Sequence, residues 1–247
     1  MIRGGKWLAA RTATFFEALH APEAAFSRPL EGPSYLVPLA LLGSAFVLLA
    51  HLQAPMSIHW AVQQMRGAGA PEGQIAAGLA AMRQSQRWAI AVVPVLLFGK
   101  WLLFAGILWL TAQLFLAAAG FSRTLSVVAF SYAPILFRDA VIFLILRIRG
   151  WSGLEDPGAL NVAIGLNLLW PRLPLPWSAL AGNINLFEFW YLALLASGMA
   201  AASRVRLRSA WGLVLPVWLF AVLIQTSLLA LSLALRSAYG ELSANSG

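Results

Sequence analysis

The chain has 247 residues, of which 60% are hydrophobic and 11% are charged, and its formal net charge at pH 7 is +8. A soluble globular domain is about half apolar and about a quarter charged, so this composition excludes soluble enzymes and disordered chains and indicates an integral membrane protein. The absence of cysteine excludes disulfides, cysteine–zinc sites, iron–sulfur clusters and thiol chemistry. Positive charge in so apolar a chain indicates flanks that meet anionic lipid, so lipid partners are expected and nucleic acid is not.

The N-terminal segment, residues 1–33, is predicted to lie at the cytoplasmic surface of the membrane. Between Trp7 and Phe26, apolar residues are interleaved with charged ones, which suits an amphipathic helix lying in the interface and broken near Pro22. Two interpretations stay open for this segment. It is either a juxtamembrane anchor or a surface that docks a cytoplasmic partner.

Five later segments are apolar and long enough to cross a hydrocarbon core of about 30 Å as helices. They cover about residues 35–52, 88–118, 125–146, 184–202 and 211–235. Their length and their richness in alanine and leucine exclude the short alternating strands of a barrel. The expected fold is therefore all-α and polytopic, with a five-helix transmembrane domain over residues 34–236 and a short tail over 237–247. Four of the spans contain prolines that are expected to kink them: Pro38, Pro94, Pro134 and Pro216.

The segments between the spans complete this topology. Residues 53–87 are polar and rich in glutamine, and residues 72–87 are predicted to be a helix that continues into the second span. Residues 159–169 are apolar but too short to cross, which indicates a surface or re-entrant segment. The short loop 203–210 carries three arginines, so the positive-inside rule places the N-terminus inside and the C-terminus outside.

Four ionisable side chains lie within the predicted spans: Lys100, Arg138, Asp139 and Glu188. Charged groups in hydrocarbon are costly and therefore mark candidate functional positions. Their signs balance, which permits two ion pairs, for example Lys100–Asp139 and Arg138–Glu188. Adjacent helical residues point about 100° apart, so Arg138 and Asp139 are expected to face different neighbours.

Ser131 and Tyr132 lie seven residues before this acid–base pair and extend it into a polar stripe on the third span. Two interpretations of the charged cluster stay open. The charges either form buried pairs that fix the register of the helices, or they build a polar site for a lipid headgroup, an ion or a proton.

Other polar residues do not form a recognisable catalytic or metal site. His51 and His59 are two histidines without further clustered ligands, and no serine has the sequence context of a nucleophile. We therefore expect no catalytic residue, no metal and no cofactor. Ala193, Ser197 and Ala201 follow one another at intervals of four, which predicts a ridge for close helix packing.

Three groups of residues, in this order and spacing, resemble the Yip family, the Ypt/Rab-interacting membrane proteins and their bacterial relatives. The first is the amphipathic stretch from Phe15 to Phe26 ahead of the first span. The second is Gly120-Phe121 followed by Ser131-Tyr132-Ala133-Pro134 in the third span. The third is Phe189-Trp190, Gly198 and the arginine loop from Arg204 to Ala210.

The resemblance covers roughly residues 10–235 and implies five membrane helices with a cytoplasmic N-terminus. Eukaryotic members are linked to Rab GTPases, vesicle traffic and membrane shaping, and they carry a long cytoplasmic region with an acidic, tyrosine-containing motif. This chain has about 30 residues there and no such motif, so a Rab-type GTPase partner is not expected. The 15 arginines against 2 lysines, together with the many alanines, indicate a bacterial member in a cytoplasmic membrane.

The function expected from these observations is non-enzymatic. The protein would organise membrane or lipids, or act as a subunit of a membrane complex with another membrane protein or a second copy of itself. The alternative is a small transporter or channel that uses the intramembrane charges.

Overall fold

The computed structural model describes residues 2–28, 33–115, 120–150, 162–170 and 172–244. Within these ranges the chain forms helices and no strand, as the expected all-α fold requires. The helices are α1 (Ile2–His20), α2 (Pro22–Ser27), α3 (Leu36–Gly67), α4 (Glu72–Phe115), α5 (Phe121–Ser131), α6 (Ala133–Arg149), η2 (Leu166–Leu168), α7 (Leu175–Gly182), α8 (Leu186–Ser203) and α9 (Leu207–Ala244).

Five helical segments of this part of the chain are long and apolar enough to cross a membrane. They are α3, α4, α5 together with α6, α8, and α9 up to Leu235. These correspond to the five predicted spans, which confirms the polytopic architecture. The end of the second predicted span, residues 116–118, lies outside the described residues.

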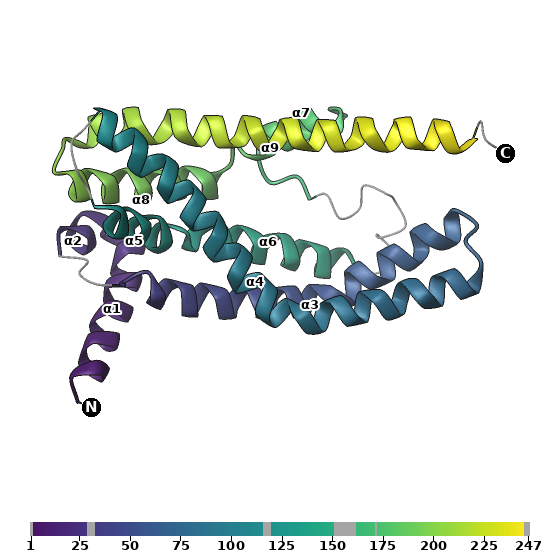
Figure 1. The fold of residues 1–247 in the computed structure, drawn as a ribbon, viewed down its shortest axis with the longest axis horizontal. Coiled ribbons are helices and arrows are strands. Elements are labelled where there is room, and N and C mark those ends of the chain that lie inside the picture. Colours follow the sequence, from purple (N-terminus) through teal and green to yellow (C-terminus); the bar gives the residue numbers. More distant parts are fainter. Residues whose placement is uncertain (1, 29–32, 116–119, 151–161, 171, 245–247) are drawn as a thin grey trace.

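Several helices are much longer than the predicted spans. The polar segment after residue 52 continues α3 to Gly67, and α4 begins at Glu72 and runs without interruption into the second span, as predicted. With 44 residues at about 1.5 Å each, α4 is about 66 Å long, more than twice the thickness of a hydrocarbon core of about 30 Å. In Figure 1, α3 and α4 therefore form an extended hairpin, beside which α9 runs the full length of the molecule.

The third predicted span is two helices rather than one. The break lies at Tyr132, whose backbone N–H donates to the carbonyl of Ala129 at 3.3 Å, in a tight turn that ends α5. Pro134 follows in the first turn of α6, where it has no N–H to donate to the preceding turn. Of the other prolines, Pro94 and Pro216 lie inside α4 and α9.

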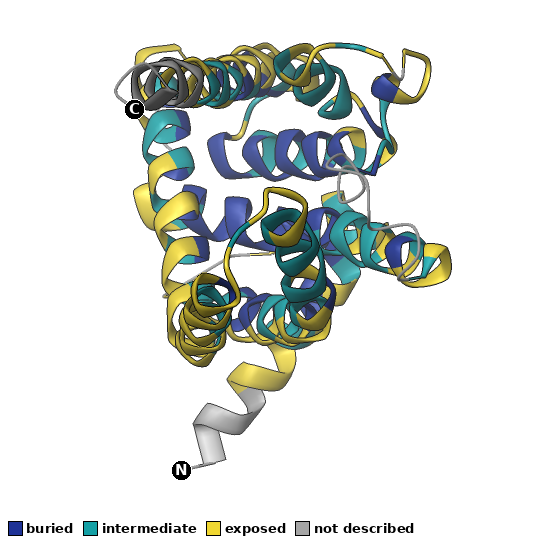
Figure 2. Cartoon of the chain, turned by 90° about the vertical axis from the view of Figure 1, so that its right-hand side faces the viewer, coloured by how far each residue is buried: buried dark blue, intermediate teal, exposed yellow. Residues whose placement is uncertain are grey.

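The core is formed mainly by α5 and α8, and buried residues gather in the middle of the molecule while the outer helices are exposed (Figure 2). Val127, Leu195 and Met199 are fully buried there. The two helices approach each other closely at Gly198, where a Cβ would lie 2.5 Å from Cγ1 of Val127. Apolar side chains outside this core cover α4 and α9, as expected for surfaces that face lipid.

The N-terminal segment has the predicted break near Pro22. The helix ends at His20 and a second one begins at Pro22, and α1 lies across the long axis of the bundle, as a helix in the membrane surface would (Figure 1). However, Phe15 and Phe26 are buried in the core. Gly198 leaves space on α8 into which the ring of Phe26 packs, and the location of this segment at the membrane surface stays a prediction.

Candidate functional site

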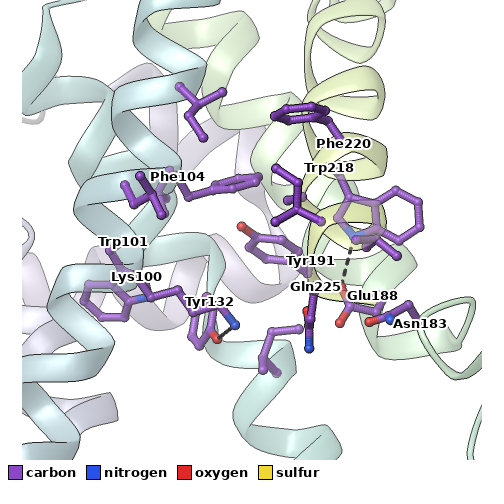
Figure 3. Close-up of a pocket in the computed structure, with 17 residues that line it drawn as sticks. Lys100, Trp101, Phe104, Tyr132, Asn183, Glu188, Tyr191, Trp218, Phe220 and Gln225 are labelled. Atoms are coloured by element: carbon purple, nitrogen blue, oxygen red, sulfur yellow. Dashed lines mark hydrogen bonds between the residues drawn. The ribbon is translucent and has the colours of Figure 1, made fainter. Parts of the chain in front are cut away.

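A cavity of about 230 Å³ lies between α4, α5, α6, α8 and α9 (Figure 3). Most of its lining is aliphatic or aromatic. Its polar lining residues are Lys100, Tyr132, Asn183, Glu188, Tyr191 and Gln225. Two of the four predicted intramembrane charges, Lys100 and Glu188, thus line the same cavity.

Arg138 binds two carboxylates beside this cavity. Its Nη1 donates to Oε1 of Glu188 at 2.8 Å, which confirms the predicted Arg138–Glu188 pair, and its Nε donates to Oδ1 of Asp139, also at 2.8 Å. Arg138 and Asp139 face different neighbours, as expected: Arg138 reaches Glu188 of α8, and Asp139 lies at a hollow that α3 lines. The arginine side chain also bends back to the adjacent carboxylate. The trio of Arg138, Asp139 and Glu188 carries a net charge of −1.

The position of Glu188 is fixed by the start of α8. Asn185 caps the helix, and its side-chain oxygen accepts a hydrogen bond from the backbone N–H of Glu188 at 3.0 Å. The indole Nε1 of Trp218 donates to the second carboxylate oxygen of Glu188 at 3.4 Å. The buried carboxylate thus accepts from Arg138 and Trp218 while Asn185 holds the backbone, which stabilises Glu188 in one orientation.

Lys100 does not form the predicted pair with Asp139. Its Nζ donates to the hydroxyl of Tyr132 at 2.9 Å and lies 5.3 Å from the centre of that ring. Asp139 lies instead at a separate hollow that Ala50 and Gln53 of α3 also line. The break after Ser131 explains the difference, because Tyr132 lies at the junction of α5 and α6 rather than in one continuous helix.

The polar and apolar parts of the cavity lie at opposite ends. In α4, Lys100 precedes Phe104 by one turn, whereas in the antiparallel α9, Gln225 follows Phe220. Both helices therefore place their polar residue toward the end where α8 begins. Figure 3 shows Lys100, Gln225 and Glu188 gathered at this end and Phe104 and Phe220 at the other.

The model of the Yip1 domain matches residues 16–229, which is more than half of the chain. The chain belongs to the Yip1 domain family. The match extends from α1 into α9 and includes every residue that lines the cavity. No curated protein and no solved structure matches the chain.

Two polar cavity residues within the membrane spans of this Yip1 domain, Tyr191 and Gln225, were not among the predicted site residues, and neither was Asn183 at the end of α7. Tyr191 follows Glu188 by one turn of α8, is buried, and packs edge-on against Tyr132 with ring centres 5.8 Å apart. Gln225 lies in the middle of the span that carries no charge. A search for uncharged polar residues within apolar spans would have found both.

The remaining predicted residues lie around the Yip1 core rather than in the cavity. Ser131 is fully buried, and its hydroxyl has no hydrogen-bond partner among the described residues. Ala193, Ser197 and Ala201 occupy a half-exposed face of α8, whereas Gly198, which packs against Val127 of α5, is buried. A packing role for the Ala193–Ser197–Ala201 ridge therefore stays a prediction.

Proposed function

We propose that this Yip1 domain protein is a non-enzymatic membrane protein that organises lipids by holding one lipid in the cavity between α4 and α9. The observation that carries the proposal is the lateral opening of the cavity. Three of its lining residues, Leu103, Phe220 and Ile224, are exposed on the outer faces of these two helices. A lipid could therefore enter from the bilayer without crossing the bundle.

The size and lining of the cavity support a partly inserted lipid. A volume of about 230 Å³ lies below the roughly 300–1,000 Å³ of usual ligand pockets, so the cavity suits a headgroup and its first carbons rather than a whole lipid with two acyl chains. The rest of the chains would lie in the bilayer against the exposed side chains of Leu103 and Phe220. A concave, mostly apolar site with a few converging polar groups is the usual form of a ligand site.

The bonding of the charges favours lipid binding over transport. A transporter or channel that used these charges would need them to exchange partners along a polar path. Arg138 is held by two carboxylates at 2.8 Å each, and Lys100 is bonded to Tyr132. Side chains bonded to one another in this way support a rigid lining beside a bound lipid.

The proposal includes a bacterial cytoplasmic membrane with the N-terminus inside. The loop between α8 and α9 supports this orientation, since it exposes Arg204, Arg206 and Arg208 at the end of the bundle where α2 also lies. The cavity's polar end then belongs to the outer half of the bilayer, remote from α1.

Native mass spectrometry of the full chain in mild detergent tests the proposal. We expect the wild-type protein to retain one phospholipid, and Ala221→Trp, which fills the cavity from α9, to lose it. Leu228→Trp is the matched control, because Leu228 is exposed on the same helix and is not a lining residue. Absence of retained lipid in the wild type, or equal retention by Ala221→Trp, would refute the proposal.

A further inference from the structure

The polar end of the cavity carries two opposite charges that do not contact each other. Lys100 reaches it from α4 and Glu188 from α8. Among the described residues, no carboxylate oxygen lies within 4.0 Å of the Lys100 ammonium. Within the described part of the chain, this ammonium donates a hydrogen bond only to Tyr132, so two of its three N–H donors remain for a ligand.

The negative charge opposite Lys100 is the excess charge of the trio. Arg138 neutralises one of the two carboxylates it binds, and the other keeps the trio at −1. Lys100 balances this charge from the other side of the cavity, so that the four groups together are neutral. The space between them is therefore bounded by a cation on one side and a net anion on the other.

This arrangement selects among phospholipid headgroups by charge. An acidic headgroup would add one uncompensated negative charge to a set of side chains that is already neutral, which is unfavourable. A zwitterionic headgroup keeps the site neutral and offers an opposite charge to each side. The amide oxygens of Asn183 and Gln225, at the same end of the cavity, can accept hydrogen bonds from an ammonium group but gain nothing from a trimethylated one.

We propose that the cavity binds a zwitterionic phospholipid with a primary ammonium group, a phosphoethanolamine headgroup. Its phosphate would bind Lys100, and its ammonium would face Glu188. The inference deepens the proposed function and rests on it. Because Phe104 and Phe220 lie toward the end near α2, the acyl chains point toward α2, and the lipid belongs to the leaflet remote from α1.

The test is competition between headgroups on the full chain. The protein in mild detergent receives equal amounts of phosphatidylethanolamine, phosphatidylcholine and phosphatidylglycerol with identical acyl chains, and native mass spectrometry identifies the retained lipid. We expect phosphatidylethanolamine to exceed each of the others about tenfold, the effect of one charge-assisted hydrogen bond. Preferential retention of phosphatidylglycerol, or equal retention of the choline and ethanolamine lipids, would overturn the inference.

Variants of Lys100 connect this preference to the site. We expect Lys100→Gln to weaken retention of phosphatidylethanolamine about tenfold and Lys100→Arg to preserve it. Arg87→Gln removes the same charge from an exposed position of the same helix and should change nothing. Since Lys100 is itself exposed, its variants are expected to fold, and a Lys100→Gln protein with wild-type selectivity would overturn the inference.

The two proposals fail in different ways. If the wild type retains no phospholipid, both fail. If it retains phospholipid without headgroup preference and Ala221→Trp releases it, the lipid-holding function stands and the headgroup assignment is wrong.

Discussion

Replacing Gly198 by alanine is expected to destabilise the protein through one contact. A Cβ at this position would lie 2.5 Å from Cγ1 of Val127, far inside the normal carbon–carbon separation of about 3.5–4.0 Å. Val127 is fully buried, and a valine in a helix has one strongly preferred rotamer, so it cannot turn aside. The ring of Phe26, at 3.3 Å on the other side, closes the remaining space. The substitution must therefore push α5 and α8 apart.

The magnitude follows from the kind of strain. Inserting one methyl group into a well-packed core costs about 1–3 kcal/mol. Gly212→Ala is the matched control, because Gly212 lies in α9 with no atom within 4 Å of its Cβ position. There the substitution should be neutral or stabilising by up to about 1 kcal/mol, since alanine loses less conformational entropy in a helix than glycine does.

Equilibrium unfolding in mixed detergent micelles, followed by circular dichroism, measures these free energies. The double variant Gly198→Ala/Val127→Ala removes the colliding methyl, so its stability should exceed the sum of the single effects by about 1–3 kcal/mol. If Gly198→Ala is as stable as the wild type, or if Val127→Ala does not relieve it, the reasoning about this contact is wrong.

Two further predictions concern ion pairs, and a third concerns the orientation of the chain in the membrane. Arg138→Gln leaves two carboxylates without their cation and should lower the free energy of unfolding by about 3–5 kcal/mol in the same assay. Arg147→Gln, at an exposed position of the same helix, should lower it little. Equal effects of the two substitutions would contradict the role of the trio. Arg28→Gln breaks an exposed ion pair to α1 and should lower stability by less than about 1 kcal/mol, with no effect in high salt. The chain lacks cysteine, so single cysteines can report on its orientation. With the N-terminus inside, Ala68→Cys lies outside and should react with an impermeant maleimide on intact cells, whereas Ser209→Cys lies inside and should react only after permeabilisation. The reverse pattern would contradict the proposed topology.

The number and approximate position of the spans were predictable because they depend on composition alone. A hydrocarbon core demands about 20 apolar residues, and each span satisfies this locally. Helix lengths were less predictable, because an apolar pattern marks only the part of a helix that lies in the bilayer. Beyond that part, α3 and α4 continue as a polar hairpin. The continuation of α4 back to Glu72 was predicted because its pattern is helical without being apolar.

The site was predictable in its charges but not in its contacts. Balanced signs made the Arg138–Glu188 pair a reasonable expectation, but the partner of Lys100 depends on the helix break at Tyr132. A proline indicates where a helix can break and not in which direction the next residue turns. The cavity itself arises from tertiary packing of five helices, for which the sequence carries no periodic pattern.

The short length of α8 links the charges to the proposed lipid. With 18 residues, α8 is about 27 Å long, slightly less than the thickness of a hydrocarbon core of about 30 Å. Its first turn, with Glu188, must therefore lie near one boundary of the membrane. Beyond it the wall of the bundle is continued by α7, which exposes Trp177, as expected of an interfacial segment.

The polar end of the cavity also lies near this boundary of the membrane. This position explains both why the charges are tolerated and how a headgroup could reach them. Charged groups cost least where water and headgroups are close, so the trio and Lys100 are tolerated there. A headgroup at the same boundary needs to move only sideways, between α4 and α9, to reach Lys100. A cavity with the same residues at the centre of the bilayer would require both the protein charges and the headgroup to be drawn into hydrocarbon.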